Sequence, residues 1–383
     1  MNEGRVFLDS FARDFQGMSE FMSFLGERDN NSNWLVTPSK GIKFHPIEKG
    51  TTEGDIYLKL FEMAGEGEVV EDTMENTRLM MAFGGKDFPV RSCAVKTILE
   101  RARISGNALN KVSCSALTEI LNYCMDVASG ESLVKVADSK ISAVHGGDPK
   151  DYAILNMKEL FQKVSEFLAS EYPGNTFVTA HFDHAMSMAI WSLDGQADQI
   201  MDAYRKEIIT RGLKRMEFTP ALKFITSDVG MSGANLYPIL LAGSQRRIVP
   251  LGMPIKTLHK SGANMDYFEE QLKMVYSRFQ MALDNQIKLM DVEIRHPCET
   301  LIRVLKRIGA PKAASYDILD QFKGINGPTP CSAYELFMYM SEIIFNAQAE
   351  GASGQRITQI EDIVAKAISI NWHDYDHSGD FTW

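Results

Sequence analysis

The longest alternating stretch of the chain, residues 175–193, constrains the fold most strongly. Apolar side chains such as Val178, Ala180 and Phe182 recur at every second position, with polar ones between them. This period of two is typical of a β-strand with one buried face. Because the stretch is longer than an ordinary strand, we expect a bend or a hairpin near Asp183.

Residues 133–155 contain a second pair of predicted strands. Two short apolar runs, 133–136 and 140–144, flank a tight polar turn at Asp138 and Ser139. Runs of this length around a turn favour a β-hairpin. Gly-Gly-Asp-Pro follows and breaks the pattern before a predicted helix.

The remaining patterns divide the chain into two parts. Further strands are predicted at 218–226, 236–241 and 248–251, with a weaker one at 56–61. We therefore predict an α+β fold, with a mixed antiparallel sheet and helices followed by a mainly helical C-terminal part. The α+β body spans residues 1–262, and the helical region with its acidic, aromatic tail spans 263–383.

Two apolar helical faces are candidates for subunit contacts. The first predicted helix ends near Gly26, and the second is a long amphipathic helix over 266–290. The apolar face of the first consists of Phe7, Phe11, Phe15, Met18 and Met22. We expect these helices to support a homo-oligomer.

Composition limits the classes of partner. The chain has 383 residues and a formal charge of −10, so nucleic acid would need a local basic patch on an acidic body. The five cysteines form no C-x-x-C pair, which favours free thiols in a reducing compartment. No apolar run reaches the ~18 residues of a membrane span, and charged residues interrupt the N-terminus. We expect a cytoplasmic protein without a membrane partner or a cofactor.

The strongest indication of function in the sequence is a set of basic segments. Residues 246–260 contain four cations and no acid, and the end of a predicted helix near 205–215 is also basic. Such residues could line one groove that neutralises phosphates, with Phe218, Tyr237 or Tyr267 stacking on bases. The alternative is that cations at a helix C-terminus only complement its dipole. The candidate nucleic-acid-binding residues are Arg101, Arg103, Arg205, Lys206, Arg211, Lys214, Arg215, Arg246, Arg247, Lys256 and Lys260.

Histidine–aspartate clusters are weaker candidates for a metal site. On a strand, His181 and Asp183 would share one face, but a closed site needs three or four ligands. His373 and His377 lie in the tail, where a solvated, partner-contacting segment is the simpler interpretation. The chain lacks a phosphate-binding G-x-x-x-x-G-K loop, G-x-S-x-G and H-E-x-x-H. We therefore expect a non-enzymatic protein without a metal, and a metal-dependent enzyme is a secondary alternative.

An acidic segment indicates an alternative function. Residues 62–75 carry six carboxylates and no base. A solvated loop and helix start explain such a run most simply. Together with the acidic tail, however, it could contact a host or phage protein, as in a host-defence or anti-defence system.

The order of segments in residues 91–160 resembles a known family. The segments AVKTILERARISGNAL, ALTEILNYCM and LVKVADSKISAVHGGDPKDYAIL look like those of the phage/plasmid-like proteins of unknown function, which mobile elements encode. FITSDVGMSGANLYPILLAGSQRRIVPLG resembles the glycine-bearing strand pair of that family, although Leu-Ala-Gly-Ser-Gln-Arg-Arg replaces its Cys-Asn-Gly-like segment. The resemblance implies a mobile-element origin, an α+β fold and an association with DNA replication, recombination or host defence. Our first expectation is a phage- or plasmid-related protein that binds single-stranded DNA and could anneal it.

Overall fold

The α+β prediction is confirmed. The structure, a computed structural model, describes residues 5–213, 217–260, 262–379, 381 and 383. Helices account for 49% and strands for 22% of the chain. Within the described residues, all the named strands pair in antiparallel fashion.

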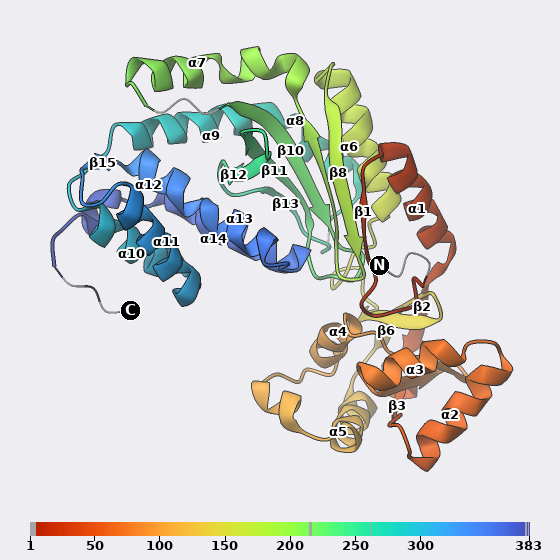
Figure 1. Ribbon diagram of the computed structural model, residues 1–383. Coiled ribbons are helices and arrows are strands. Elements are labelled where there is room, and N and C mark those ends of the chain that lie inside the picture. The colour runs from red at the N-terminus through yellow and green to blue at the C-terminus, as the bar shows by residue number, and fades with distance from the viewer. Residues whose placement is uncertain (1–4, 214–216, 261, 380, 382) are drawn as a thin grey trace.

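A seven-stranded sheet forms the centre of the large lobe (Figure 1). Its order is β1-β8-β9-β10-β11-β12, and β13 also pairs with β11. The predicted bend is the β8–β9 turn, where the Asp183 carboxylate accepts hydrogen bonds from the backbone N–H groups of Ala185 and Met186. The strands are β1 (Ala12–Phe15), β8 (Thr176–Asp183), β9 (Ser187–Ser192), β10 (Phe218–Thr226), β11 (Ala234–Ala242), β12 (Arg247–Pro250) and β13 (Ile255–Thr257).

One face of this sheet packs on the helices between the strands. Because side chains alternate along a strand, Phe224 of β10 points to this face, 4.9 Å from the ring of Phe161 and 5.4 Å from that of Phe268. These rings belong to one continuous apolar core. The helices are α1 (Met18–Asn30), α6 (Met157–Glu171), α7 (Ala197–Thr210), α8 (Met265–Lys273) and α9 (Val275–Met290), with the 3₁₀ turn η3 (Asp194–Gln196) before α7.

The C-terminal part is mainly helical, as predicted. Pro297 opens α10, and Gly309 ends it in the left-handed conformation with φ 86°. The boundary near residue 262 stays a prediction, but Trp372 near the C-terminus belongs to the same apolar core as the sheet. The elements are β14 (Glu293–Ile294), α10 (Pro297–Ile308), α11 (Lys312–Ile325), β15 (Cys331–Ser332), α12 (Ala333–Met340), α13 (Glu342–Ala349), α14 (Gly354–Ala365), η4 (Lys366–Ser369) and η5 (Trp372–Tyr375).

Residues 32–151 form a small lobe below the large one in Figure 1. It has its own apolar cluster around Ile98 and Val134. The predicted hairpin is β6–β7, whose turn residues Asp138 and Ser139 both have positive φ, as a tight hairpin turn requires. The elements are β2 (Ser32–Pro38), η1 (Ser39–Gly41), β3 (Lys43–Pro46), α2 (Thr52–Met63), α3 (Gly67–Glu75), β4 (Leu79–Phe83), β5 (Lys86–Pro89), α4 (Ala94–Arg101), η2 (Asn107–Lys111), α5 (Cys114–Val127), β6 (Glu131–Ala137) and β7 (Lys140–Gly146).

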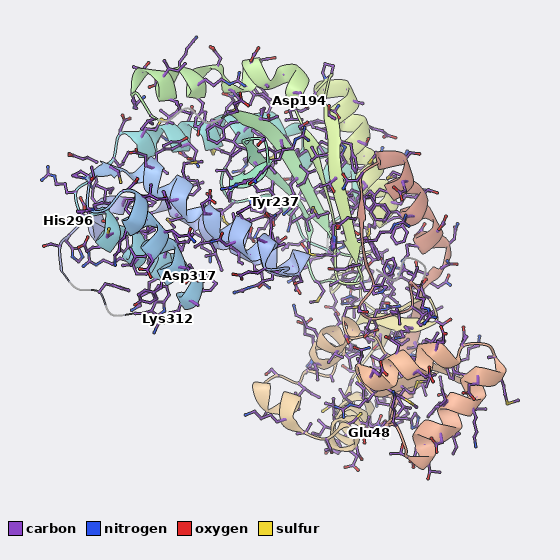
Figure 2. All side chains as sticks on the ribbon, viewed as in Figure 1. Glu48, Asp194, Tyr237, His296, Lys312 and Asp317 are labelled. Carbon is purple, nitrogen blue, oxygen red and sulfur yellow. The ribbon has the colours of Figure 1, made fainter. Side chains whose placement is uncertain are left out.

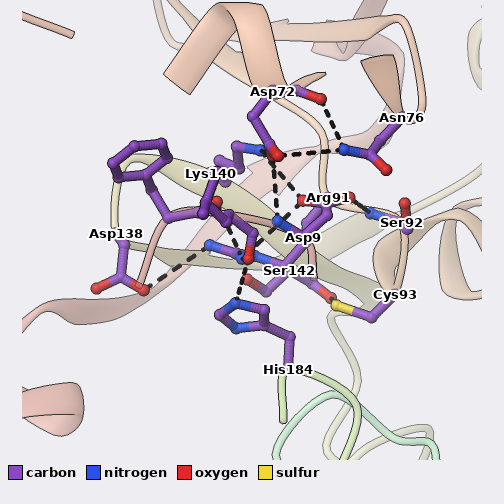
Figure 3. A network of polar contacts seen from close by, with 12 residues as sticks. Asp9, Asp72, Asn76, Arg91, Ser92, Cys93, Asp138, Lys140, Ser142 and His184 are labelled. Atoms are coloured by element: carbon purple, nitrogen blue, oxygen red, sulfur yellow. Dashed lines mark hydrogen bonds and ion pairs between the residues drawn. The ribbon is translucent and has the colours of Figure 1, made fainter. Parts of the chain in front are cut away.

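A buried polar network joins the two lobes where the N-terminal segment passes between them (Figure 3). The carbonyl oxygen of Leu8 accepts a hydrogen bond from Arg91 of the small lobe and lies 2.9 Å from Nε2 of His184 in the large lobe. Lys140, which is fully buried, forms an ion pair of 3.1 Å with Asp9. The segment therefore binds both lobes at once.

Three predicted elements were wrong. The N-terminal stripe is not one helix, because residues 12–15 form β1 at the sheet edge and α1 begins only at Met18. The predicted strand at 56–61 is helix α2, which begins after Thr51, whose hydroxyl accepts a hydrogen bond from the N–H of Gly54. The long helix at 266–290 is interrupted at Met274, which separates α8 from α9.

Among the described residues, no helix is both long and apolar enough to cross a membrane.

Candidate nucleic-acid interface

A cavity of about 700 Å³ lies between the β11–β12 turn, the end of α7 and helices α11 to α13. Leu213 and Phe218 line it from one side, and Tyr334 and Tyr339 of α12 line it from the other. Side-chain amides also line it: Gln245, Gln321 and Asn326. A volume of this size is in the range of small-molecule sites, which bury mostly apolar surface around a few polar groups.

Local sequence explains how the walls are positioned. In the β11–β12 turn, Gly243 and Arg246 have φ of 64° and 50°, which is the left-handed region that glycine adopts most readily. On the opposite wall, Ser332 and Glu335 form a capping box that starts α12. This cap fixes the first turn of α12, from which Tyr334 faces the cavity.

Arg247 is the cation of the cavity wall, and its guanidinium is already engaged. Nη1 donates to the carboxylate of Glu342 at 2.6 Å, and Nε and Nη2 donate to the side-chain oxygen of Gln245 at 3.1 and 3.0 Å. The guanidinium also lies 4.1 Å from the ring centroid of Phe345. Arg247 therefore shapes the wall and orients Gln245, and it is poorly placed to bind a phosphate by itself.

The hydroxyl groups of the cavity stay protonated near neutral pH. The Tyr334 and Tyr204 hydroxyls share a hydrogen bond of 2.8 Å. Burial raises the pKa of Tyr334 to about 12, and burial also raises the pKa of Tyr339. The Glu335 carboxylate accepts hydrogen bonds from Ser332. The described lining thus offers amides, hydroxyls and aromatic rings, while its carboxylates, Glu335 and Glu342, are bound by Ser332 and Arg247. This set suits binding of an uncharged planar group.

The cations of α7 are mostly paired. Arg205 binds Asp198 and Lys206 binds Asp202, each at 2.6 Å. Arg211 binds Asp291 at 2.8 Å and also contacts Glu207. Lys214 and Arg215 lie outside the described residues. Pairing within the helix and with α9 lowers the charge that these residues present to a ligand.

The cations of residues 246–260 do not form one surface. Arg246 is exposed in the turn at the cavity, whereas Lys256 lies in β13, 3.9 Å from Asp362 of α14. Lys260 is exposed after β13. Within the described residues, Leu213 of the first segment and Arg247, Ile248 and Val249 of the second line the same cavity.

Arg101 and Arg103 belong to the small lobe, away from α7 (Figure 1). Arg101 donates hydrogen bonds to the hydroxyls of Ser39 and Ser132 and to the carbonyl oxygen of Ser129, so it holds the small lobe together. Arg103 is exposed and has a positive φ. The structure does not join these two residues to the other candidates.

Of the three aromatic candidates for base stacking, only Phe218 lines the cavity. Tyr237 is buried in the middle of the molecule (Figure 2), where it lies on the sheet beside Lys223. Tyr267 is 43% exposed on α8. The ring that sequence reasoning missed is Tyr339, which packs edge-on against Phe322 of α11.

The weak metal candidates, His181 and Asp183, lie beside Asp14, so that two carboxylates flank the His181 imidazole. His181 Nδ1 lies 2.7 Å from Asp14 and Nε2 lies 3.7 Å from Asp183. Burial lowers the pKa of His181, but the hydrogen bonds and charges of Asp183 and Asp14 outweigh burial, so the net pKa is raised. Across the described residues, no three His, Cys, Asp or Glu side chains are grouped to hold a metal ion.

The tail lies against α10 through part of its length: Trp372 and Asp376 make contacts there, whereas His373, Asp374 and His377 are exposed, as expected of a solvated segment. Trp372 is buried and donates to the carbonyl oxygen of Ala367. Asp376, between His373 and His377, accepts hydrogen bonds from the backbone N–H groups at 295 and 296. This carboxylate anchors the chain end at the start of α10.

A buried ion pair on the second face of the sheet was also missed. Nζ of Lys223 lies 2.8 and 2.7 Å from the carboxylate oxygens of Glu361, and both side chains are almost fully buried. Because Lys223 is in β10 and Glu361 is in α14, the pair attaches the C-terminal helices to the sheet. The sequence predicted a strand at 218–226, but no local pattern identified Glu361 as the partner of Lys223.

No family model, curated protein or solved structure matches the chain. The function is therefore proposed from the site.

Proposed function

We propose that the protein binds single-stranded nucleic acid, with one unpaired base in the cavity of about 700 Å³. The observation that carries the proposal is a cavity lined by side-chain amides and aromatic rings, which Leu213 after α7 and Arg247 of β12 both line. The end of α7 and the β11–β12 turn, which are far apart in the chain, border the same cavity. Phosphates flanking the bound base would lie at the mouth, near the exposed Arg246.

The chemistry of the lining favours a base over a phosphate. Gln321 and Asn326 carry amide donors and acceptors that match the edge of a base, and Tyr339 offers a ring face for stacking. The one described arginine of the wall, Arg247, is neutralised by Glu342. A base in a duplex is stacked on both faces and cannot enter such a cavity without leaving the helix, so single strands would be preferred.

The broader role is part of the same proposal. The resemblance to phage/plasmid-like proteins supports a mobile-element origin and work in DNA replication or recombination. A homo-oligomer would suit annealing, and α8 and α9 expose Tyr267, Met274 and Met281 by 43%, 37% and 53% at intervals of seven residues. Met274 lies at the junction of α8 and α9, so the three exposed side chains come from two consecutive helices.

The experiment is fluorescence anisotropy with a labelled single-stranded oligonucleotide. Tyr339→Ala removes the stacking ring, and base–aromatic stacking of ~1–3 kcal/mol predicts a loss of affinity of about 5- to 150-fold. Tyr123→Ala is the matched control, because Tyr123 is 74% exposed on the small lobe and its removal should leave the affinity unchanged. Equal affinities of the Tyr339→Ala variant and the wild-type protein would contradict the proposal.

A further inference from the structure

The solvent face of α2 carries an apolar stripe that the fold leaves uncovered. Ile56, Leu60 and Met63 are 53%, 54% and 87% exposed. Their spacing of four and three residues places them in one row along the helix. With a rise of 1.5 Å per residue, the row is roughly 10 Å long.

The opposite side of α2 packs against the rest of the small lobe. Tyr57, Leu58 and Phe61 pack against a separate small cluster that includes Val70 and Met80. The exposed row therefore lies outside the cluster that packs the small lobe. Three large apolar side chains in a row on one helix differ from the single exposed residues that most surfaces carry.

Acidic side chains border this row. Residues 51–76, which contain α2 and α3, hold eight acidic residues and one base, Lys59. On α2 itself Glu53, Asp55 and Glu62 are exposed. Within the described residues, none of these three carboxylates has a lysine or arginine at ion-pair distance, whereas Glu75 of α3 is paired with Lys49.

This combination of shape and charge identifies the kind of partner. We infer that the α2 face binds an amphipathic, positively charged helix of another protein. A partner helix can pack its own apolar row beside Ile56, Leu60 and Met63, and its lysines or arginines would then lie opposite the three unpaired carboxylates.

The same charges argue against two other ligands. Helices that lie on membranes carry lysine and arginine beside their apolar face, because the lipid surface is negative. Nucleic acid would be repelled by the acidic border for the same reason. The inference goes beyond nucleic-acid binding and concerns a different surface, since α2 lies in the small lobe and the cavity lies in the large one.

The test uses a fluorescent, helix-forming peptide with a leucine row bordered by lysines, and a second peptide in which glutamates replace the lysines. We expect the full-length protein to bind the lysine peptide in a salt-sensitive way and the glutamate peptide at least tenfold more weakly. The double variant Leu60→Gln/Met63→Gln should lose at least tenfold in affinity for the lysine peptide. Val127→Gln is the matched control, because Val127 is 70% exposed on α5 of the same lobe and should bind like wild type.

Three results would overturn the inference. They are equal binding of the two peptides, equal binding of the double variant and wild type, and loss of binding in the Val127→Gln control.

Two further outcomes would replace the proposed partner with another occupant. If light scattering showed that the double variant is a monomer where the wild type is an oligomer, the occupant would be a second copy of this chain. Binding to vesicles of zwitterionic and anionic lipid would point to a membrane instead. Oligonucleotide affinity should not change in the double variant, so this test and that of the cavity fail independently.

Discussion

Removal of Glu361 should destabilise the protein strongly, because it would leave the Lys223 ammonium buried without its partner. The two side chains are 2% and 3% exposed, and the shortest N–O distance is 2.7 Å. Breaking one partner of such a buried pair costs about 3–5 kcal/mol. We therefore expect Glu361→Gln to lower the free energy of unfolding by roughly this amount. Urea unfolding followed by tryptophan fluorescence measures it, since Trp191 and Trp372 are buried in the same lobe.

Two comparisons separate this explanation from a general loss of packing. Replacing both partners, as in Lys223→Met/Glu361→Leu, removes the unpaired charge and should restore much of the stability. The ion pair between Lys163 and Glu269 has the same distance of 2.7 Å, but its side chains are 39% and 42% exposed. Glu269→Gln should therefore leave the unfolding midpoint nearly unchanged. The reasoning is refuted if Glu361→Gln is as stable as Glu269→Gln, or if the double replacement is less stable than the single one.

Two further predictions concern pH and the chain end. Burial lowers the pKa of His145 to about 4, so the unfolded chain binds the proton more readily, and stability should fall as the pH drops from about 6.5 to 4. His145→Phe, which preserves stacking on Tyr152 3.9 Å away, should flatten this slope in urea unfolding between pH 7 and 4.5, and an unchanged slope would disprove the assignment. Asp376→Ala should cost about 1 kcal/mol, because its carboxylate caps the backbone N–H groups at the start of α10. Thermal unfolding checks this, and an unaltered midpoint together with an unaltered rate of proteolysis at the C-terminus would show that the tail is not anchored there.

Patterns that depend on neighbours in sequence predicted the fold well. Alternation over 175–193 led directly to β8 and β9 with a turn after Asp183, because a period of two reflects the two faces of one strand. The same reasoning gave a wrong prediction for residues 56–61, which lie in helix α2 and not in a strand. The row of Ile56, Leu58 and Leu60 alternates, but the helix that forms instead packs Tyr57, Leu58 and Phe61 inward, and short apolar runs do not separate these periods.

The candidate site was much less predictable. Its wall combines Arg247 after β11, Gln321 from α11 and Tyr339 from α12, and no local pattern indicates that these segments meet. The basic segments drew attention to the β11–β12 turn, but charge alone did not show that Arg247 is bound by Glu342, 95 residues away. Lys223 and Glu361, 138 residues apart, were missed for the same reason. Local sequence patterns do not predict tertiary contacts between polar residues that are far apart in the chain.

A salt titration of oligonucleotide binding shows whether the protein prefers single-stranded nucleic acid. The wild-type protein would be mixed with labelled single- and double-stranded oligonucleotides of one sequence over a series of salt concentrations. We expect tighter binding of the single strand at every concentration. The affinity should fall as salt rises because each phosphate contact releases counterions, and the slope should be shallow because a chain of charge −10 neutralises few phosphates. Absence of binding at low salt, or a preference for the duplex, would contradict it.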